Sequence, residues 1–155
     1  MTTTDLTPPV TTQTALADRF ILTQVEAYTL VFPAIWVTEL LRIDRSQILD
    51  LPFYDSLLVG IANYNGQMTP LIAAARLLGS AQSALPERVM VVRLNQAVGT
   101  LANVGIIIDR AIGSTTRSEL PEQLFTAHCA EEMMMMRPAL VPTGLWQPQY
   151  WSAHN

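Results

Sequence analysis

The sequence predicts a mainly β protein of the barrel class with short helices, and three observations support this prediction. Short runs rich in β-branched and aromatic residues recur at intervals of roughly 8–12 residues. No sustained alternation of strands and helices accompanies them. Half of the 155 residues are apolar and 14% are charged, so the chain can bury a large core. The length suits one domain, or two small lobes that share a core.

Three predicted strands occupy the first part of the folded chain. The runs RFILTQV and YTLVF favour β structure, and Glu26-Ala27 between them predicts a turn. A third run, AIWVTELLRI, predicts another strand. On this strand Ile35, Val37 and Glu39 should share one face, because successive side chains of a strand alternate between faces.

The stretch GIANYNGQMTPLI, residues 60–72, predicts a tight β-hairpin. Asn65-Gly66 joins two apolar runs, and both residues tolerate the positive φ that a two-residue turn requires. The hairpin carries no catalytic group. It presents exposed backbone and short polar side chains on rigid strands, which is typical of a docking element.

Further elements follow the hairpin. AAARLLG favours a short helix that ends at Gly79, and RVMVVRL and VGIIID predict two more strands, the second one fully buried. Residues 119–125 favour a short helix near Pro121. EEMMMM permits a helix that Arg137-Pro138 would stop.

Composition excludes several classes of function. All nine basic residues are arginine, so neither a Schiff-base lysine nor a P-loop lysine exists. The arginines are scattered and the net charge is −4, which disfavours a nucleic-acid-binding face. The single cysteine, Cys129, excludes an internal disulfide framework and a multi-cysteine zinc site. We expect no cofactor and no metal.

The N-terminal residues 1–17, rich in Thr and Pro, offer little to bury. We expect a flexible tail there and a folded domain over residues 18–155. The N-terminus lacks the basic and apolar regions of a signal peptide. The longest largely apolar stretch, residues 27–41, is too short and too interrupted to span a bilayer. We therefore expect a cytoplasmic protein with no membrane insertion.

Two sets of residues suggest an enzyme, and each has a simpler explanation. His128 and Cys129 are adjacent, and neighbouring side chains diverge in a helix and in a strand, so a thiol–imidazole pair is disfavoured. Asp109 ends the run GIIID, where a turn-starting carboxylate that accepts backbone N–H groups is the better interpretation. We expect no catalytic residue.

Two groups of large apolar residues have open roles. The run Met133, Met134, Met135 and Met136 either fills the core on a short helix or forms an adaptable contact patch. Trp146, Tyr150 and Trp151 are expected to close the core rather than to stack on a ligand.

Together these patterns resemble the CheW family of chemotaxis coupling proteins. GIANYNGQMTPLIAAARLLG is similar to the family's hairpin signature, which Gly60, Asn63, Gly66 and Pro70 fit in spacing. The opening run, residues 19–43, resembles the family's first strands. VGIIIDRAIG resembles its Gly-x-x-x-Asp strand, and the resemblance covers residues 18–116 in the family's order.

The chain departs from the family pattern at three places. The arginine that the family usually carries just before the hairpin glycine is Asn65 here, and the Asp that often follows the second strand is Ala73. The last part of the chain resembles a reduced version of the family's final strands. Its Arg137-Pro138 and Trp146 resemble the PilI and PixI branch of pilus and phototaxis pathways.

The resemblance implies two five-stranded SH3-like β-barrels and a non-enzymatic adaptor. Such an adaptor couples the cytoplasmic tips of methyl-accepting receptors to the regulatory domain of a CheA-type histidine kinase. The implied docking surface lies on the first barrel and comprises Val37, Glu39, Gly60, Asn63, Asn65 and Gly66. Receptor helices would lie in an apolar groove between the barrels. A bulky acidic residue at position 60 should then weaken kinase binding without unfolding the protein.

Three other functions compete with this interpretation. A small ligand-binding β-barrel would take an apolar molecule in its groove. An enzyme would use His128 or Asp109. A regulatory fragment of the kinase itself is disfavoured, because the chain begins with a tail and shows no kinase motif.

Overall fold

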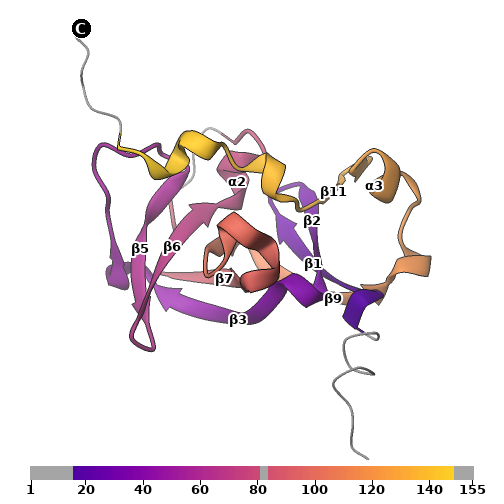
Figure 1. The fold of residues 1–155 in the computed structure, drawn as a ribbon, viewed down its shortest axis with the longest axis horizontal. Helices are drawn as coiled ribbons and strands as arrows, with labels where there is room; N and C mark the ends of the chain where they lie inside the picture. Colours follow the sequence, from indigo (N-terminus) through magenta and orange to yellow (C-terminus); the bar gives the residue numbers. More distant parts are fainter. Residues whose placement is uncertain (1–15, 81–83, 149–155) are drawn as a thin grey trace, which may run out of the picture.

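The computed structural model describes residues 16–80 and 84–148, and two mixed β-sheets dominate it (Figure 1). The predicted tail, residues 1–17, lies outside the described residues except for its last two positions. The strands are β1 (Arg19–Val25), β2 (Tyr28–Pro33), β3 (Val37–Asp44), β4 (Ile48–Leu49), β5 (Leu58–Tyr64), β6 (Gln67–Ala73), β7 (Arg88–Leu94), β8 (Gly105–Ile108), β9 (Arg110–Thr116), β10 (Cys129–Ala130) and β11 (Met133–Met135).

Short helical segments connect the strands. The α-helices whose bounds lie within the described residues are α2 (Ala74–Leu77) and α3 (Gln123–Thr126), and residues 16–17 at the start of the described part are also helical. The 3-10 segments are η1 (Ala34–Trp36), η2 (Arg45–Gln47), η3 (Gln96–Leu101), η4 (Arg117–Glu119), η5 (Pro138–Leu140) and η6 (Thr143–Trp146). Among the described residues no helix is long and apolar enough to cross a membrane.

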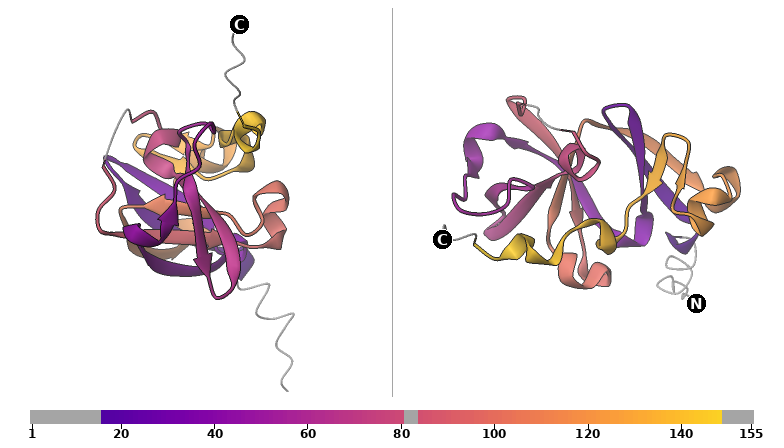
Figure 2. Two further views of the ribbon diagram at one scale, coloured as in Figure 1. Left: turned by 90° about the vertical axis from the view of Figure 1, so that its left-hand side faces the viewer. Right: turned by 90° about the horizontal axis from the view of Figure 1, so that it is seen from above.

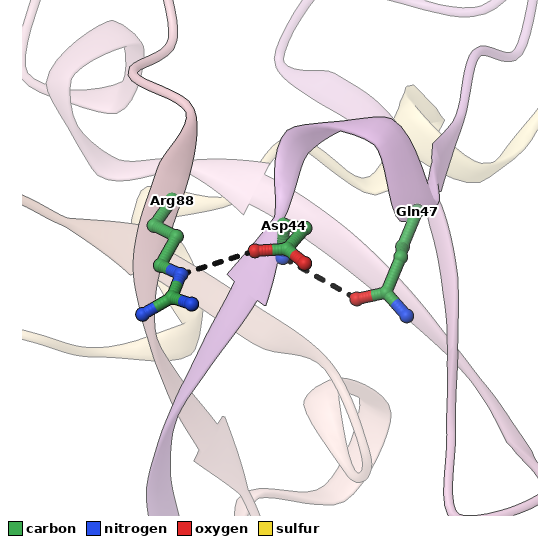
Figure 3. A network of polar contacts seen from close by, with 3 residues as sticks. All are labelled: Asp44, Gln47 and Arg88. Atoms are coloured by element: carbon green, nitrogen blue, oxygen red, sulfur yellow. Dashed lines mark hydrogen bonds and ion pairs between the residues drawn. The ribbon is translucent and has the colours of Figure 1, made fainter.

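The larger sheet has the strand order β3-β7-β8-β6-β5-β4 and curls on itself. Its two edge strands, β3 and β4, are consecutive in the chain and joined only by the three residues of η2. At this corner the Asp44 N–H donates to Gln47 Oε1, and Arg88 Nε lies 3.2 Å from Asp44 Oδ1 (Figure 3). The short connection brings the edges of the sheet near one another.

The smaller sheet has the order β10-β11-β2-β1-β9 and combines strands from both ends of the chain. β11 runs parallel to β2, with Met133 opposite Thr29 and Met135 opposite Val31. β9 pairs with β1 with a bulge near Leu22. The segment that follows β11 runs along one side of the molecule from the smaller sheet to the larger one (Figure 2).

Three clusters of buried side chains hold the sheets together. The inner core fills the concave face of the larger sheet and comprises Leu41, Ile43, Ala62, Leu71, Val89, Val91 and Ile107. The shared core lies between the sheets and includes Val25, Leu30, Phe32, Leu58, Ile72, Val92, Leu94, Val98, Leu101, Ile106, Ile108, Met136, Val141 and Leu145. The outer core covers the other face of the smaller sheet with Phe20, Val31, Leu120, Leu124 and Met135.

Most predicted elements agree with the structure. The runs RFILTQV and RVMVVRL form β1 and β7 with the predicted bounds. The chain after α2 adopts a positive φ of 100° at Gly79, and the Ser80 N–H donates to the Ala75 carbonyl, which is the expected glycine-ended helix terminus. The prediction of a mainly β fold is confirmed.

The structure corrects the predicted local structure in four places. Ile35 belongs to the 3-10 turn η1 rather than to a strand, because the chain bends after Pro33. The segment between β3 and β5, for which no strand was predicted, contains the short strand β4. The Met run forms a hairpin strand, since Glu131 adopts a positive φ of 56° and turns the chain. Residues 137–148 form 3-10 turns rather than reduced final strands.

Gly60 permits the close approach of β4 to β5, and substitution there should destabilise the fold. A Cβ at position 60 would lie 2.4 Å from the Leu49 carbonyl oxygen and 2.8 Å from Ile48 Cγ2. We expect Gly60→Ala to lower the free energy of unfolding by about 1–3 kcal/mol, measured by urea denaturation. Gly113→Ala is the control, because a Cβ there meets nothing within 4 Å. Equal stability of the two variants would contradict this account.

Candidate docking surface

The predicted hairpin is present, and its turn is rigidly held. Asn65 and Gly66 have φ values of 52° and 80°, and Tyr64 pairs with Gln67 across the turn. Asn63 Oδ1 accepts a hydrogen bond of 3.1 Å from the Gly66 N–H. Asn63, Asn65 and Gly66 are exposed and Tyr64 is half-buried, so a partner could reach the turn.

Val37 and Glu39 lie at the start of β3, where a bulge interrupts the pairing with β7. Val37 is half-buried and packs against the shared core. Glu39 faces Arg93 on β7, and Arg93 Nη1 lies 3.2 Å from Glu39 Oε2. The carboxylate therefore has a partner within the chain.

Tyr64, at the end of β5, links the hairpin to Arg93 on β7. Its ring packs against the inner core, and the guanidinium carbon of Arg93 lies 5.9 Å from the ring centroid. Arg93 thus contacts both Glu39 and Tyr64, and it places the residues of the turn beside the start of β3. The structure brings together five of the predicted docking residues: Val37, Glu39, Asn63, Asn65 and Gly66.

The hairpin is also attached to η3 and, through it, to η1. Asn103 Nδ2 donates to the Met68 carbonyl at 3.3 Å. Asn95 Nδ2 donates to the Ile35 carbonyl at 2.7 Å, and the Asn95 N–H donates to the Trp36 carbonyl. Loop asparagines therefore fix the surface around Val37, Glu39 and the turn. We call this region, residues 34–39 and 63–68 with Arg93, the docking surface.

Sequence reasoning missed Arg93 and Tyr64 as members of the docking surface. The signal for Arg93 lies in the run RVMVVRL, where it alternates with Val89 and Val91. Both valines are buried in the inner core, so an arginine in this register points to the concave face of the sheet and requires a partner there.

Gly60 does not belong to the docking surface. It is buried, and its hydrogen atoms face β4 rather than solvent. A Cβ at position 60 would collide with the backbone of Leu49, so an acidic residue there should disturb the fold itself and would not test partner binding separately.

The Met run does not form an exposed patch. Met135 and Met136 are 8% and 0% exposed, and they lie in the outer and shared cores respectively. Met133 and Met134 are half-buried and pack against these same two cores. Strand alternation therefore distributes the four side chains over both faces of the smaller sheet.

The structure shows what surrounds the residues that the sequence suggested for catalysis or ligand binding. Asp109 Oδ2 accepts a hydrogen bond of 2.7 Å from the Glu26 N–H, as expected for a carboxylate in a turn. His128 and Cys129 are exposed. The described ranges contain no group of three or more His, Cys, Asp or Glu side chains that could hold a metal ion. Trp146 packs against the shared core, whereas Tyr150 and Trp151 lie outside the described residues.

A groove lies between the two sheets, and the concave face of the larger sheet is filled. The groove measures about 290 Å³, and Ala73, Met90 and Ile107 contribute to its apolar lining. Glu26 and Asp109 also line it. Side chains of the inner core occupy the space inside the curled sheet, which argues against a ligand within the barrel.

Comparison with known proteins identifies the fold. The sequence profile of the CheW-like domain matches residues 19–126, which is most of the chain. The chain belongs to the CheW-like family. The CheW-like match therefore includes β1 to β9, the hairpin and α3.

Among solved structures, the scaffolding protein TtCheW from Thermoanaerobacter tengcongensis resembles this chain with a TM-score of 0.53. The two sequences are 16% identical, and the match covers 64% of this chain and 65% of TtCheW. At this identity the likeness shows a common CheW-like fold. None of the curated proteins compared with the chain matches it.

The hydrogen bond within the turn makes a direct contribution to stability. We expect Asn63→Ala to destabilise the protein by about 1 kcal/mol, because the Gly66 N–H loses its side-chain acceptor. Urea denaturation would measure the change, and hydrogen exchange at Gly66 should accelerate. Gln67→Ala, at an exposed neighbouring position, should leave both quantities unchanged. Unaltered exchange at Gly66 in the Asn63 variant would refute this role.

Proposed function

We propose that this protein is a non-enzymatic cytoplasmic adaptor that couples methyl-accepting receptors to a CheA-type histidine kinase. The observation that supports the proposal is its membership of the CheW-like family over residues 19–126, together with a rigid and exposed hairpin. TtCheW, which resembles this chain in fold, is a scaffolding protein. Residues 18–155 would act as one domain with two lobes.

The docking surface would bind the regulatory domain of the kinase. Its exposed part consists of the hairpin turn and neighbouring apolar side chains such as Met68 and Ile35, which are 52% and 40% exposed. Apolar side chains on a rigid support are suited to form the centre of a protein interface. Val37 and Glu39, half-buried at the start of β3, would align the kinase domain relative to the exposed turn.

The groove between the sheets would receive the receptor. Its apolar lining, with Met90 and Ile107, suits the apolar face of a helix, and Glu26 and Asp109 would meet polar groups at its edge. One adaptor would then hold kinase and receptor at separate places, so both could bind at once.

The pathway served is chemotaxis, phototaxis or pilus motility. The resemblance of Arg137-Pro138 and Trp146 to the PilI and PixI branch supports pilus motility or phototaxis. Pull-down of the receptors from the same cell, followed by mass spectrometry, would identify the pathway.

Calorimetry with the purified kinase regulatory domain from the same cell tests the proposal. Met68→Glu should weaken binding about tenfold or more, equivalent to about 1.4 kcal/mol, because it places a charge in an apolar contact. Ile112→Glu is the matched control, since Ile112 is similarly exposed at 46% but lies on β9 of the other sheet. Saturable binding lost only in the Met68 variant supports docking through this surface. No binding by the folded wild type would overturn the proposed function.

A further inference from the structure

Glu39 and Arg93 form an ion pair whose surroundings differ from those of a typical surface pair. Both side chains extend from the concave face of the larger sheet, on adjacent strands, with Nη1 and Oε2 3.2 Å apart. The Arg93 side chain is only 16% exposed and the Glu39 side chain 35%. Arg93 Nε is buried and donates to no acceptor among the described residues. Glu39 therefore supplies the only carboxylate that neutralises this cation in the described part of the chain.

A second ion pair on the same two strands provides a direct comparison. Asp44 and Arg88 also join β3 to β7 (Figure 3), with Arg88 Nε 3.2 Å from Asp44 Oδ1. Their side chains, however, are 53% and 67% exposed. Water screens this exposed pair, whereas the lower local dielectric around Glu39 and Arg93 strengthens their attraction. The two pairs have the same N–O distance and differ in burial.

The segments around the docking surface contain no other charge. Residues 34–38, which lead into Glu39, carry no acidic or basic side chain. The same is true of residues 56–75, which contain the hairpin, and of residues 94–108, which contain η3. Hydrogen bonds from Asn95 and Asn103 hold these three segments together. Glu39 and Arg93 are thus the two charges of this surface, and they cancel one another.

We infer that Arg93 is the positioning residue of the docking surface and that the partner surface bound there is apolar and uncharged. Arg93 neutralises Glu39 and holds Tyr64, so the carboxylate is not free to bind a basic side chain of the partner. The cation expected just before the hairpin glycine is absent at Asn65, and Arg93 supplies one from β7 instead. This inference rests on the proposed function, since it describes the kinase surface that docks here.

The first test is the salt dependence of binding by the wild-type protein. Calorimetry with the kinase regulatory domain at about 50 and about 500 mM NaCl should give dissociation constants within about threefold of one another, because little charge is paired across the interface. Weakening by about tenfold or more would show that the surface uses ionic contacts, and it would overturn the inference while leaving the proposed function intact. No binding at either salt concentration would overturn both.

The second test exposes the Glu39 charge. Arg93→Met should weaken kinase binding about tenfold, because docking would then bury an uncompensated carboxylate. The double variant Glu39→Gln with Arg93→Met should recover most of the lost affinity. The matched pair, Arg88→Met alone and with Asp44→Asn, should bind like the wild type. Equal affinity of Arg93→Met and the wild type would refute the positioning role.

Thermal unfolding of the same variants separates positioning from folding. The melting temperature of Arg93→Met should fall by several degrees and be largely restored in the double variant, whereas the Asp44 and Arg88 variants should shift it little. If Arg93→Met does not fold, Arg93→Lys keeps the positive charge but replaces the guanidinium group that lies near the Tyr64 ring. Kinase binding by Arg93→Lys should remain independent of salt concentration. Salt-dependent binding by this variant would contradict the claim that a positive charge at position 93 neutralises Glu39.

Discussion

The fold depends on one constraint: the central strands of the larger sheet are apolar on both faces. β7 and β8 carry buried side chains toward the inner core and toward the shared core, so neither face can meet water. The sheet satisfies one face by curling on itself. The other face must be covered by different parts of the chain, and the smaller sheet, η3 and the segment from η5 to η6 cover it. Surfaces for partners are therefore restricted to turns, edges and the rim of the cores.

This restriction explains where the paired charges are placed. The two ion pairs between β3 and β7 lie at opposite ends of the same pair of strands, beyond the apolar centre. At one end Asp44 lies at the corner where β3 leads into η2 and β4. At the other end Glu39 supports the surface beside the hairpin. Charged side chains at the boundary of a core can thus pair across adjacent strands where the apolar core ends.

Sequence patterns predicted the elements that are decided locally. Asn65-Gly66 predicts a tight turn and RVMVVRL predicts a strand, and the structure has both at the predicted residues. Elements decided by distant contacts were not predictable in this way. The run from Met133 to Met136 has no strong local preference, and Met133 to Met135 form a strand because β2, far away in the chain, offers an edge for pairing.

The exposed hairpin turn was predictable from the sequence, and the contacts that support it were less so. The exposed Asn63, Asn65 and Gly66 follow from the hairpin alone. Arg93 is separated from them in sequence, and only the pairing of β3 with β7 reveals that it meets Glu39. Gly60 was grouped with the turn because it lies in the same hairpin, but β4 passes close to it and buries it.

The smaller sheet takes its strands from distant parts of the chain, and this limits the order in which the two sheets can form. β1 and β2 are made before the other described strands, but their neighbours β9 and β11 come from residues 110–116 and 133–135. The strands of the larger sheet lie between residues 37 and 108, so all of them have been synthesised before β9 and β11. Distant pairings form slowly because a long loop must close first. The hairpin of β1 and β2 is therefore synthesised before the other described strands, and it finds its last strand only after every residue of the larger sheet has been made.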